Sequence, residues 1–386
     1  MVPGDRYQYH PPRDDDLGID PEEQMSERNF ETTAAFRELI DAMRELEDTF
    51  LFGDRAVEQD VSVIEGYRWI FSLTQVAFDC YVWADKDRPH FVDIVGRHKK
   101  WGGDNADAYY QYAALDPART YRVHLDAGDA VYLSLSVYEW PDDGGAAEGI
   151  VGSLHLDEMQ ANPDGTCDIV LSAEECPGNW IRLSPKTNAA ITRDYLADPF
   201  NDKRAVWTIE SDDPPSTTRV TDEDMARRFR AATTWIKEQC TITPVPPIGD
   251  PNTMQEPLPV GAITYGWGAG DASYGMGNYD LEDDEALIIE GTSPKCPFWN
   301  LCIWNEFLHT YNYDYERVSI NGHQIAYNSD GSWTLVISAQ DPGHPNWIHT
   351  QGHKSGILWA RWFLPEETPA QPTTRVVKVG DVAESI

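Results

Sequence analysis

The sequence predicts a mainly β fold: two antiparallel β-sandwich units of jelly-roll type, with accessory α-helices at the N-terminus and in the linker. Apolar residues recur every three or four positions before Pro89 and every second position after it, which marks a change from helices to strands. The later strands are short, evenly spaced and separated by turn signals such as Asp164-Gly165 and Asp330-Gly331. A helical pattern and a Pro/Gly-rich stretch divide these strands into two groups.

The length of 386 residues exceeds what a single hydrophobic core usually supports, so we expect more than one domain. Hydrophobic residues make up 41% of the chain and aromatic residues 11%, enough to fill the cores of a globular protein. The patterns predict five parts: an acidic, disordered-like tail (1–25), an N-terminal helical segment (26–90), a first β-sandwich (91–215), a linker helix with a Gly/Pro-rich crossover (216–279), and a second β-sandwich with the C-terminal tail (280–386).

Three helices are predicted from the apolar spacing. From Phe30 to Phe50 the apolar residues alternate with charged ones at helical intervals, which indicates an amphipathic helix at about 27–51. A more apolar pattern predicts a second, more buried helix at about 61–83. Thr221 or Asp222 would cap a third helix at 222–239, which carries one apolar stripe.

Strict alternation predicts the strands. It is clearest in Tyr121–Leu125 and Val131–Val137, where apolar and polar residues alternate as in half-buried strands. Further strands are predicted at Val151–Leu156, Asp168–Leu171, Trp180–Leu183, Ala190–Thr192, Glu285–Glu290, Trp299–Trp304, Ser332–Ser338, Ile357–Phe363 and Thr374–Val379. The sequence shows no obvious internal repeat, although the two β regions are candidates for structural relatives.

The charge balance restricts the partners. Lys and Arg total 30 and Asp and Glu total 65, so the formal net charge is −35. A strongly acidic chain lacks the basic surface that nucleic acids and anionic membranes require, and neither is an expected partner. We expect a small-molecule substrate or ligand instead, and the sequence leaves a homo-oligomer open.

The cysteines and the N-terminus indicate the compartment. The six cysteines form no Cys-x-x-Cys pair, so we expect free thiols and no structural zinc. The segment Met1–Asp5 lacks the basic and apolar regions of a signal peptide, and no stretch approaches 18 apolar residues. A cytoplasmic protein without cofactor or metal is the resulting expectation.

Two segments resemble a known family. Lys100–Asp107 leads into Tyr121-Arg122-Val123, and the second segment consists of Ser319–Gln324, Asp330-Gly331, Asp341–Trp347, Gly352-His353 and Ala360–Trp362. Together they are similar to the bacterial group numbered 1214 among the domains of unknown function, whose relatives are often fused to a domain numbered 1254. The resemblance spans about residues 60–365 and implies a β-rich, sandwich-like fold without an agreed activity. Position 349 is His, where such relatives are expected to carry Asp, so no carboxylate role is transferred there.

The C-terminal signature concentrates chemistry-bearing residues. Asp341, His344, His349 and His353 lie close in sequence, with Arg361 nearby. Histidine moves protons near neutral pH, and Arg361 is suited to hold an anionic group. The alternative is a structural turn around Asp341-Pro342-Gly343. The histidine spacing also allows a loop-borne metal site, but Gly352 and Pro345 disfavour the helix that such spacing usually needs, and we expect no metal.

A second polar and aromatic cluster lies at Asp104–Tyr112. An Asx-turn before a strand explains it structurally, whereas ligand binding by the tyrosines is the functional alternative. Because aromatic rings suit sugar-like and steroid-like faces, we assign ligand-binding roles to Asn105, Tyr109, Asn346, Trp347 and Trp362. Core filling is the competing explanation for the many tryptophans.

Two functional hypotheses follow. The first is a cofactor-independent lyase, hydrolase or isomerase that acts on a small apolar or carbohydrate-like substrate in a cleft between the sandwiches. Its catalytic residues would be His353, Asp104, Arg361 and His349, with His353 and Arg361 facing a shared pocket. The alternative is a non-catalytic sandwich that binds a small molecule or glycan on Trp/Tyr platforms. A cleft that joins His353, Arg361 and Asp104 would favour the enzyme.

Overall fold

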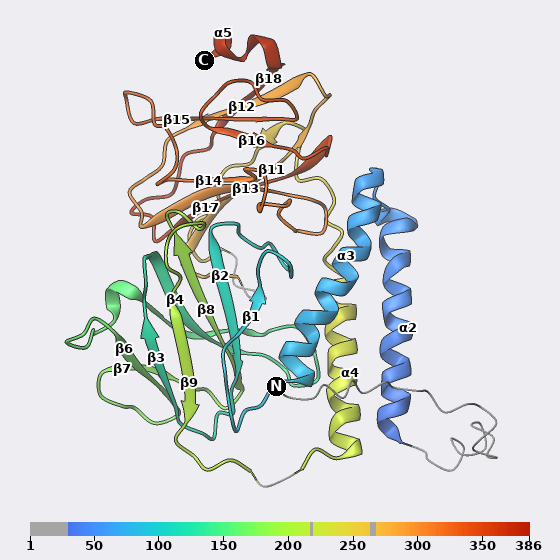
Figure 1. Ribbon diagram of the computed structural model, residues 1–386, viewed down its shortest axis with the longest axis vertical. Coiled ribbons are helices and arrows are strands. Elements are labelled where there is room, and N and C mark those ends of the chain that lie inside the picture. Colours follow the sequence, from blue (N-terminus) through green and yellow to red (C-terminus); the bar gives the residue numbers. More distant parts are fainter. Residues whose placement is uncertain (1–29, 217–218, 263–267) are drawn as a thin grey trace, which may run out of the picture.

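The computed structural model describes residues 30–216, 219–262 and 268–386. Two β-sandwiches lie one above the other along the long axis, and a layer of helices covers one side of the first (Figure 1). This arrangement confirms the mainly β fold with accessory helices that the change of period predicts. The tail expected at 1–25 lies outside the described residues.

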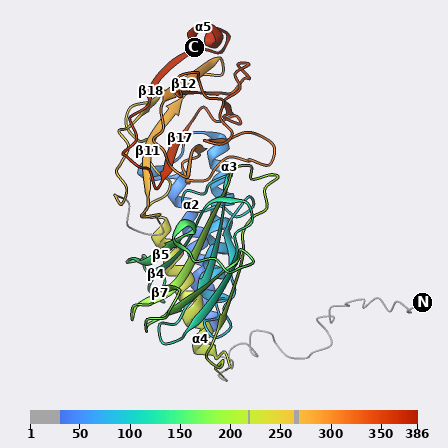
Figure 2. The ribbon, with the colours of Figure 1, turned by 90° about the vertical axis from the view of Figure 1, so that its left-hand side faces the viewer.

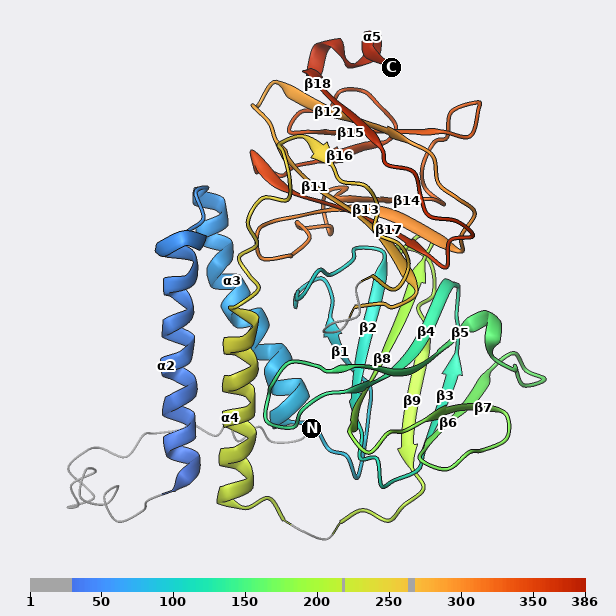
Figure 3. The same cartoon turned by 180° about the vertical axis from the view of Figure 1, so that it is seen from behind.

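The helices form where the apolar spacing predicts them. Helix α2 spans Glu31–Leu51, α3 spans Asp60–Ala77 and continues into a π-helical turn at Phe78–Val82, and α4 spans Asp222–Gln239. Thr221 caps α4, because its hydroxyl accepts a hydrogen bond from the backbone N–H of Asp224 at 3.1 Å. The three helices pack on one another, and α2 lies outermost (Figure 3).

The first sandwich consists of two sheets. One has the strand order β1-β2-β8-β4-β5, and the other has the order β7-β6-β3-β9. The strands are β1 Val92–Val95, β2 Ala108–Ala114, β3 Tyr121–Asp126, β4 Ala130–Glu139, β5 Gly149–His155, β6 Cys167–Ser172, β7 Asn179–Arg182, β8 Thr187–Leu196 and β9 Val206–Ser211.

The five-stranded sheet of this sandwich is buried on both faces. Leu133, Leu135 and Val137 of β4 face the other sheet, as the alternation predicts. The opposite face of β4 is buried too, and Tyr138 belongs to the core that the sheet forms with the helices. Figure 2 shows the helices behind this sheet. The expectation of half-buried strands is therefore wrong for β4, since serine and tyrosine on its second face are covered by the helical layer and by the second sandwich.

The second sandwich has the sheet orders β10-β11-β17-β13-β14 and β16-β15-β12-β18. Its strands are β10 Thr253–Met254, β11 Ala272–Asp280, β12 Glu285–Gly291, β13 Phe298–Trp304, β14 Ser319–Asn321, β15 Trp333–Ser338, β16 Trp347–His349, β17 Ser355–Phe363 and β18 Thr373–Lys378, followed by the short helix α5 Val382–Ser385. Its core lies between the two sheets.

The two sandwiches are structural repeats. Adding nine to each strand number of the first sandwich reproduces both strand orders of the second. Even the departure from antiparallel pairing recurs, because β7 pairs in parallel with β6 and β16 pairs in parallel with β15. Side-chain pairing follows the same symmetry: Tyr110 lies opposite Arg193, and Tyr274 lies opposite Arg361. The sequence gives no obvious sign of this repeat, because few of the equivalent residues are identical.

One conserved detail of the repeat explains part of the C-terminal signature. The side-chain oxygen of Asn346 accepts a hydrogen bond from the backbone of Ala326, and its amide nitrogen donates to the carbonyls of Ala326 and Thr334. Asn179 makes the same three bonds to backbone groups of the first repeat. Both asparagines therefore hold a parallel strand against the neighbouring turn, which is a structural task.

The second sandwich begins earlier than the expected boundary at residue 280. Strand β10 and all of β11 except its last residue, Asp280, lie inside the segment expected to be a crossover, 216–279. The glycines that suggest a loop are required by close packing: a Cβ at Gly277 would lie 2.1 Å from the carbonyl oxygen of Thr253 on β10. Glycine in β11 thus marks a close backbone approach between strands, a reason that composition alone does not reveal.

The repeats meet along a seam of four aromatic rings. The ring centroids of Tyr195 and Phe363, which occupy equivalent positions, are 4.6 Å apart. The other equivalent pair, Tyr132 and Phe298, flanks them, with Tyr132 4.5 Å from Phe363 and Phe298 4.9 Å from Tyr195. All four side chains are buried. The contacts are related by the repeat, so the two sandwiches pack about an approximate two-fold axis.

Two aspartates bind across this seam. Asp271 of the second repeat accepts hydrogen bonds from Tyr132 and His155 of the first, with His155 Nε2 at 2.9 Å. Its equivalent, Asp107 of the first repeat, accepts from three side chains of the second: Asn300, Ser319 and Asn321. Each repeat therefore supplies a carboxylate that satisfies polar groups of the other, which fixes how the sandwiches are positioned.

We predict that Asn346→Ala lowers the free energy of unfolding by about 1–3 kcal/mol, because it leaves buried backbone groups without partners. Asn179→Ala should have an effect of the same size, since it breaks the equivalent contacts. Urea denaturation measures both, with the exposed Asn201→Ala as a control expected to change stability by less than about 0.5 kcal/mol. An Asn346→Ala variant as stable as the control would contradict the structural role.

Candidate functional site

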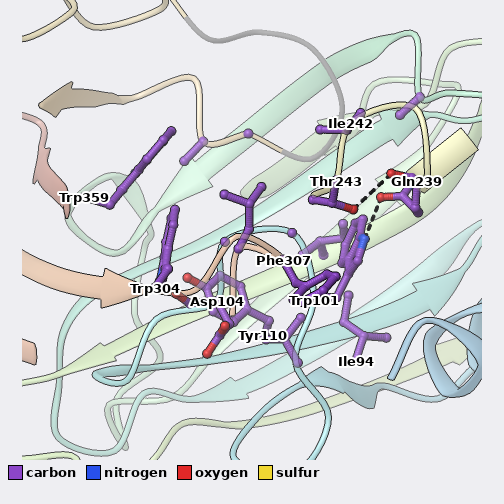
Figure 4. Close-up of a pocket in the computed structure, with 18 of the residues that line it drawn as sticks. Ile94, Trp101, Asp104, Tyr110, Gln239, Ile242, Thr243, Trp304, Phe307 and Trp359 are labelled. Carbon is purple, nitrogen blue, oxygen red and sulfur yellow. Dashed lines mark hydrogen bonds between the residues drawn. The ribbon is translucent and has the colours of Figure 1, made fainter. Parts of the chain in front are cut away.

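A cavity of about 330 Å³ lies where the seam meets the helices. Strands β2 and β8 of the first repeat and β11 and β17 of the second contribute to its wall, and α3 and the end of α4 close it. Figure 4 shows Trp304 and Trp359 at one end, Trp101 and Gln239 at the other, and Phe307 between them. The Nε1–H of Trp101 donates to Gln239 at 2.7 Å, which holds this closing wall in place.

The lining of the cavity is mainly aromatic and apolar. Its tryptophans come from the helices, the loops and the second sandwich: Trp69, Trp101, Trp140, Trp235, Trp304 and Trp359. Its tyrosines are Tyr110, Tyr195 and Tyr274. Few polar groups interrupt this surface, so the cavity has the character of a pocket for a small, largely apolar molecule.

Two arginines related by the repeat line the cavity. Arg193 donates a hydrogen bond to the hydroxyl of Tyr138 at 2.8 Å. Arg361 donates through Nη2 to the carbonyl of Gly103 and lies 4.9 Å from the ring centroid of Trp304. The Nη1 of Arg361 is buried and has no acceptor within the described part of the chain. The two equivalent arginines therefore differ: Arg193 donates to a tyrosine hydroxyl, whereas Arg361 has one N–H group without an acceptor in the ranges that the structure describes.

A second donor without a partner lies beside Arg361. The indole nitrogen of Trp359 is buried and has no acceptor among the described residues. Trp359 precedes Arg361 by two positions on β17, so both side chains point to the same face of the sheet. The ring of Trp359 stacks on Trp304 with centroids 4.8 Å apart. Two residues that line the cavity, two positions apart on one strand, thus each have a buried donor without an acceptor among the described residues.

Asp104 is one of two carboxylates among the described residues of the cavity wall, and the other is Glu238 at the end of α4. Asp104 is only 2% exposed. One carboxylate oxygen accepts from the backbone N–H of Thr310 at 2.8 Å, and the other accepts from the Thr310 hydroxyl. Both oxygens are therefore engaged by Thr310, which ties the loop after β1 to the second sandwich.

His353 lies outside this cavity. Its Nδ1 is 3.0 Å from the carbonyl oxygen of Thr350, and its Nε2 is 3.0 Å from the carboxylate of Glu65 on α3. Burial alone would raise the pKa of Glu65, but the hydrogen bond and charge of His353 outweigh it and hold that pKa below its ordinary value. Both ring nitrogens of His353 therefore lie within hydrogen-bond distance of an oxygen acceptor. The ring also stacks on Tyr311 with centroids 3.9 Å apart.

His353 instead lines a separate, more open hollow between α3 and the second sandwich, together with Glu65, His309 and Lys100. Burial lowers the pKa of His309 to about 4, so this ring is neutral near pH 7. The structure therefore places His353 in one hollow and Arg361 with Asp104 in another. The expected pocket joining His353 to Arg361 is not among those that the described residues form.

The remaining expected site residues lie elsewhere. Nδ1 of His349 is 3.2 Å from the carboxylate of Glu316. Trp362 packs in the core of the second sandwich and donates to Ser293 at 2.9 Å, on the opposite face of β17 from Arg361. Trp347 is half-buried and donates to the carbonyl of Ser338.

Two residues of the first cluster hold the seam and its surroundings. Asn105 exchanges hydrogen bonds with Asn300 of the second repeat, at 2.7 and 3.3 Å. The ring of Tyr109 lies 4.1 Å from the guanidinium of Arg204. It points away from the cavity that its neighbour Tyr110 lines.

The three clustered histidines have separate partners. His344 accepts from the backbone N–H of Asn346 at 3.2 Å, whereas His349 and His353 approach different glutamates. In the described ranges, no group of three or more His, Cys, Asp or Glu side chains is arranged to hold a metal ion. No helix in the part of the chain that the structure describes is long and apolar enough to cross a membrane.

Sequence reasoning missed most of the cavity wall, although one signal for it exists. Asp-Ala-x-Tyr occurs at Asp107–Tyr110 and again at Asp271–Tyr274, and these segments open the equivalent strands β2 and β11. The final tyrosine of each copy lines the cavity opposite one of the two arginines. A search for short repeated motifs would have pointed to both strands.

Comparison with known proteins gives a family and a solved relative. Two segments, residues 106–199 and 275–367, match DUF1214, described as a protein of unknown function. Each segment lies within one repeat. An uncharacterised protein of Burkholderia cenocepacia has a similar crystal structure, with 28% sequence identity and a TM-score of 0.79 over 89% of this chain and 97% of that chain. A protein of Vibrio parahaemolyticus gives 12% identity and a TM-score of 0.47 over 87% of this chain and 100% of that one. No curated protein matches the chain.

We predict that the Glu65–His353 pair stabilises the fold in a pH-dependent way. The pKa of Glu65 in the folded protein lies below its ordinary value of 4.5, so the pair's contribution is present above pH 4.5 and is lost as the pH falls through the folded pKa. The difference in unfolding free energy between wild type and Glu65→Gln should therefore be largest near neutral pH and shrink on acidification. Urea denaturation between pH 7 and pH 3 measures this difference.

The exposed Glu58→Gln variant serves as the control for that series, since no partner holds its side chain among the described residues. If the difference in unfolding free energy between wild type and Glu65→Gln stays constant down to pH 3, the ion pair does not stabilise the fold in the predicted way.

Proposed function

We propose that this member of the DUF1214 family binds a small, mainly apolar, ring-containing molecule in the cavity between its two repeats. The observation that carries the proposal is the aromatic cavity itself, whose wall combines both repeats with α3 and α4. Its volume of about 330 Å³ falls at the lower end of the range typical for ligand pockets, which suits a molecule of one or two rings. The face-on surfaces of the indoles are suited to stack on such rings.

The chemistry of the wall favours binding over acid–base catalysis. No histidine is among the described residues that line the cavity. Of the two carboxylates among these residues, Asp104 has both oxygens engaged by Thr310, and Glu238 lies next to Gln239 at the end of α4. A general base needs a lone pair within reach of the substrate proton, and both oxygens of Asp104 already accept hydrogen bonds. Glu238 has no histidine beside it in the described wall to act as its acid–base partner. The hypothesis of a binding protein with aromatic platforms therefore has more support than the enzyme hypothesis, with the difference that the platforms enclose a cavity.

The packing around the cavity also supports ligand binding. A dry, well-packed seam would stabilise the two sandwiches more than a hollow one, because every unfilled volume forfeits packing contacts. The aromatic rings of the seam fill the region around Tyr195 and Phe363, whereas the region next to it stays open. A ligand that occupies this space would recover those contacts.

We predict that the neutral probe 2-naphthamide binds to the wild-type protein and that Ala147→Trp weakens its binding by about tenfold or more, a change of about 1.4 kcal/mol. Ala147 lies on the loop before β5 and lines the cavity, so an indole there would occupy the ligand's space. Quenching of tryptophan fluorescence and isothermal titration calorimetry both report binding. Benzamide and cyclohexanecarboxamide extend the series to smaller and non-aromatic rings.

The matched control is Ala118→Trp, which adds the same side chain at an exposed turn of the first sandwich. It should bind 2-naphthamide as the wild type does. Failure of every ring probe to bind the wild-type protein, or equal binding by wild type and Ala147→Trp, would refute the proposed site.

A further inference from the structure

Arg361 and Trp359 give the cavity an unusual polar corner. Both side chains lie on the inward face of β17, with the indole of Trp304 in contact with each of them. Nη1 of Arg361 and Nε1 of Trp359 are buried donors that no described group of the protein satisfies. We infer that the ligand carries a carboxylate, which these two donors hold while its ring lies among the tryptophans. This inference rests on the proposed function and names the chemical class of its ligand.

The electrostatic situation of Arg361 supports an anion. Its side chain is only 5% exposed, and it forms no ion pair with any described carboxylate. Asp107 is buried in the same region, but its oxygens accept from Asn300, Ser319 and Asn321. A buried guanidinium N–H without an acceptor is costly, and a ligand carboxylate would remove that cost through a charge-assisted hydrogen bond.

The repeat supplies an internal comparison. Arg193 occupies the position in the first sandwich that Arg361 occupies in the second, and each guanidinium lies near an aromatic ring at the end of the neighbouring strand. For Arg193 this ring is Tyr138, whose hydroxyl accepts its hydrogen bond at 2.8 Å. For Arg361 the equivalent ring is Trp304, whose only polar group is a donor, and that donor is used on the carbonyl of Asp104 at 3.0 Å.

Where the first repeat has Tyr138, the second has Trp304. Arg361 therefore lacks the hydroxyl acceptor that Arg193 has, and its Nη1 stays unpaired within the part that the structure describes, although its Nη2 donates to a backbone carbonyl. Both Arg361, with its unpaired Nη1, and Trp359, whose indole N–H likewise has no acceptor there, line the cavity, two positions apart on β17. Since a carboxylate has two oxygens, it can accept from the guanidinium and from the indole at the same time. A neutral ligand with a single weak acceptor would leave one of these donors unsatisfied.

The class of anion follows from the number of donors and from the surrounding surface. A phosphate dianion usually needs several cations or backbone N–H groups, whereas this corner offers one charged group and one neutral donor. The rest of the wall is mainly aromatic and apolar, with the carboxylate of Glu238 at the end of α4. A monocarboxylate with one or two rings therefore matches the site, and a phosphorylated or strongly polar molecule does not.

The test compares 2-naphthoate with 2-naphthamide, which share the ring and differ in charge. By isothermal titration calorimetry at pH 7, wild type should bind 2-naphthoate at least about tenfold more tightly than 2-naphthamide, because a hydrogen bond to a charged group is stronger than a neutral one. Arg361→Gln should bring the ratio of the two affinities close to one. Trp359→Phe should weaken 2-naphthoate more than 2-naphthamide.

The control variant is Trp362→Phe, which makes the same kind of change on the same strand but on the face that points into the second sandwich. It should keep the wild-type ratio even if the protein becomes less stable. If Arg361→Gln fails to fold, Arg361→Lys replaces it, because lysine keeps the charge but lacks the planar guanidinium. A lower ratio of 2-naphthoate to 2-naphthamide affinity in both Arg361→Lys and Trp359→Phe would support the inference. A wild-type ratio in both variants would overturn it.

The outcomes separate the inference from the proposed function. Equal affinities of the wild-type protein for the two probes, with binding abolished by Ala147→Trp, would overturn the carboxylate and leave the cavity as a site for neutral rings. A ratio that survives Arg361→Gln would overturn the role of Arg361. Absence of binding for both probes would overturn the proposed function and the inference together.

Discussion

The contact between Tyr195 and Phe363, 4.6 Å apart on the approximate two-fold axis, is the contact around which the two repeats are arranged. Each ring also packs on the partner repeat's flanking ring, so four aromatic side chains hold the sandwiches together over a small area. Aromatic pairs of this kind contribute about 0.5–1.5 kcal/mol each beyond the burial of their surface. Because equivalent residues meet, the position of one repeat determines that of the other, and with it the position of every wall of the cavity.

Polar groups around the axis make this arrangement specific. Asp107 and Asp271 each reach into the opposite repeat, and their partners differ: amide and hydroxyl groups bind Asp107, whereas Tyr132 and His155 bind Asp271. Burial raises the pKa of Asp107, whereas at Asp271 the hydrogen bond and charge of His155 outweigh burial and lower the pKa. A shift of either repeat along the seam would leave buried groups without partners, a cost that apolar packing alone would not impose.

The sequence predicts the local structure well because local structure depends on local patterns. The spacing of apolar residues was sufficient for α2, α3 and α4 and for most strands, and resemblance to the family identified the fold. The repeat was missed because its symmetry resides in strand order and in buried positions, where Tyr195 and Phe363 are equivalent without being identical. The site was misjudged for a related reason. His353 and Asn346 belong to a compact sequence motif, yet one holds α3 and the other holds a turn. Arg361 and Trp359 lie two positions apart on β17, but Tyr110 of the first repeat joins them only in three dimensions.

The difference between the repeats indicates where function can arise in a duplicated fold. Features that both repeats share, such as the turn held by Asn179 and Asn346, are explained by the stability of each sandwich. Features that only one repeat has need another explanation. The replacement of the hydroxyl of Tyr138 by the indole of Trp304 leaves Arg361 without the acceptor that Arg193 has, and it does so on the wall of the cavity. A buried guanidinium N–H without an acceptor destabilises a protein that has no ligand for it. The described chain therefore has a cavity and two unsatisfied donors on residues that line it, and a ligand that satisfies them would stabilise the same seam on which the fold depends.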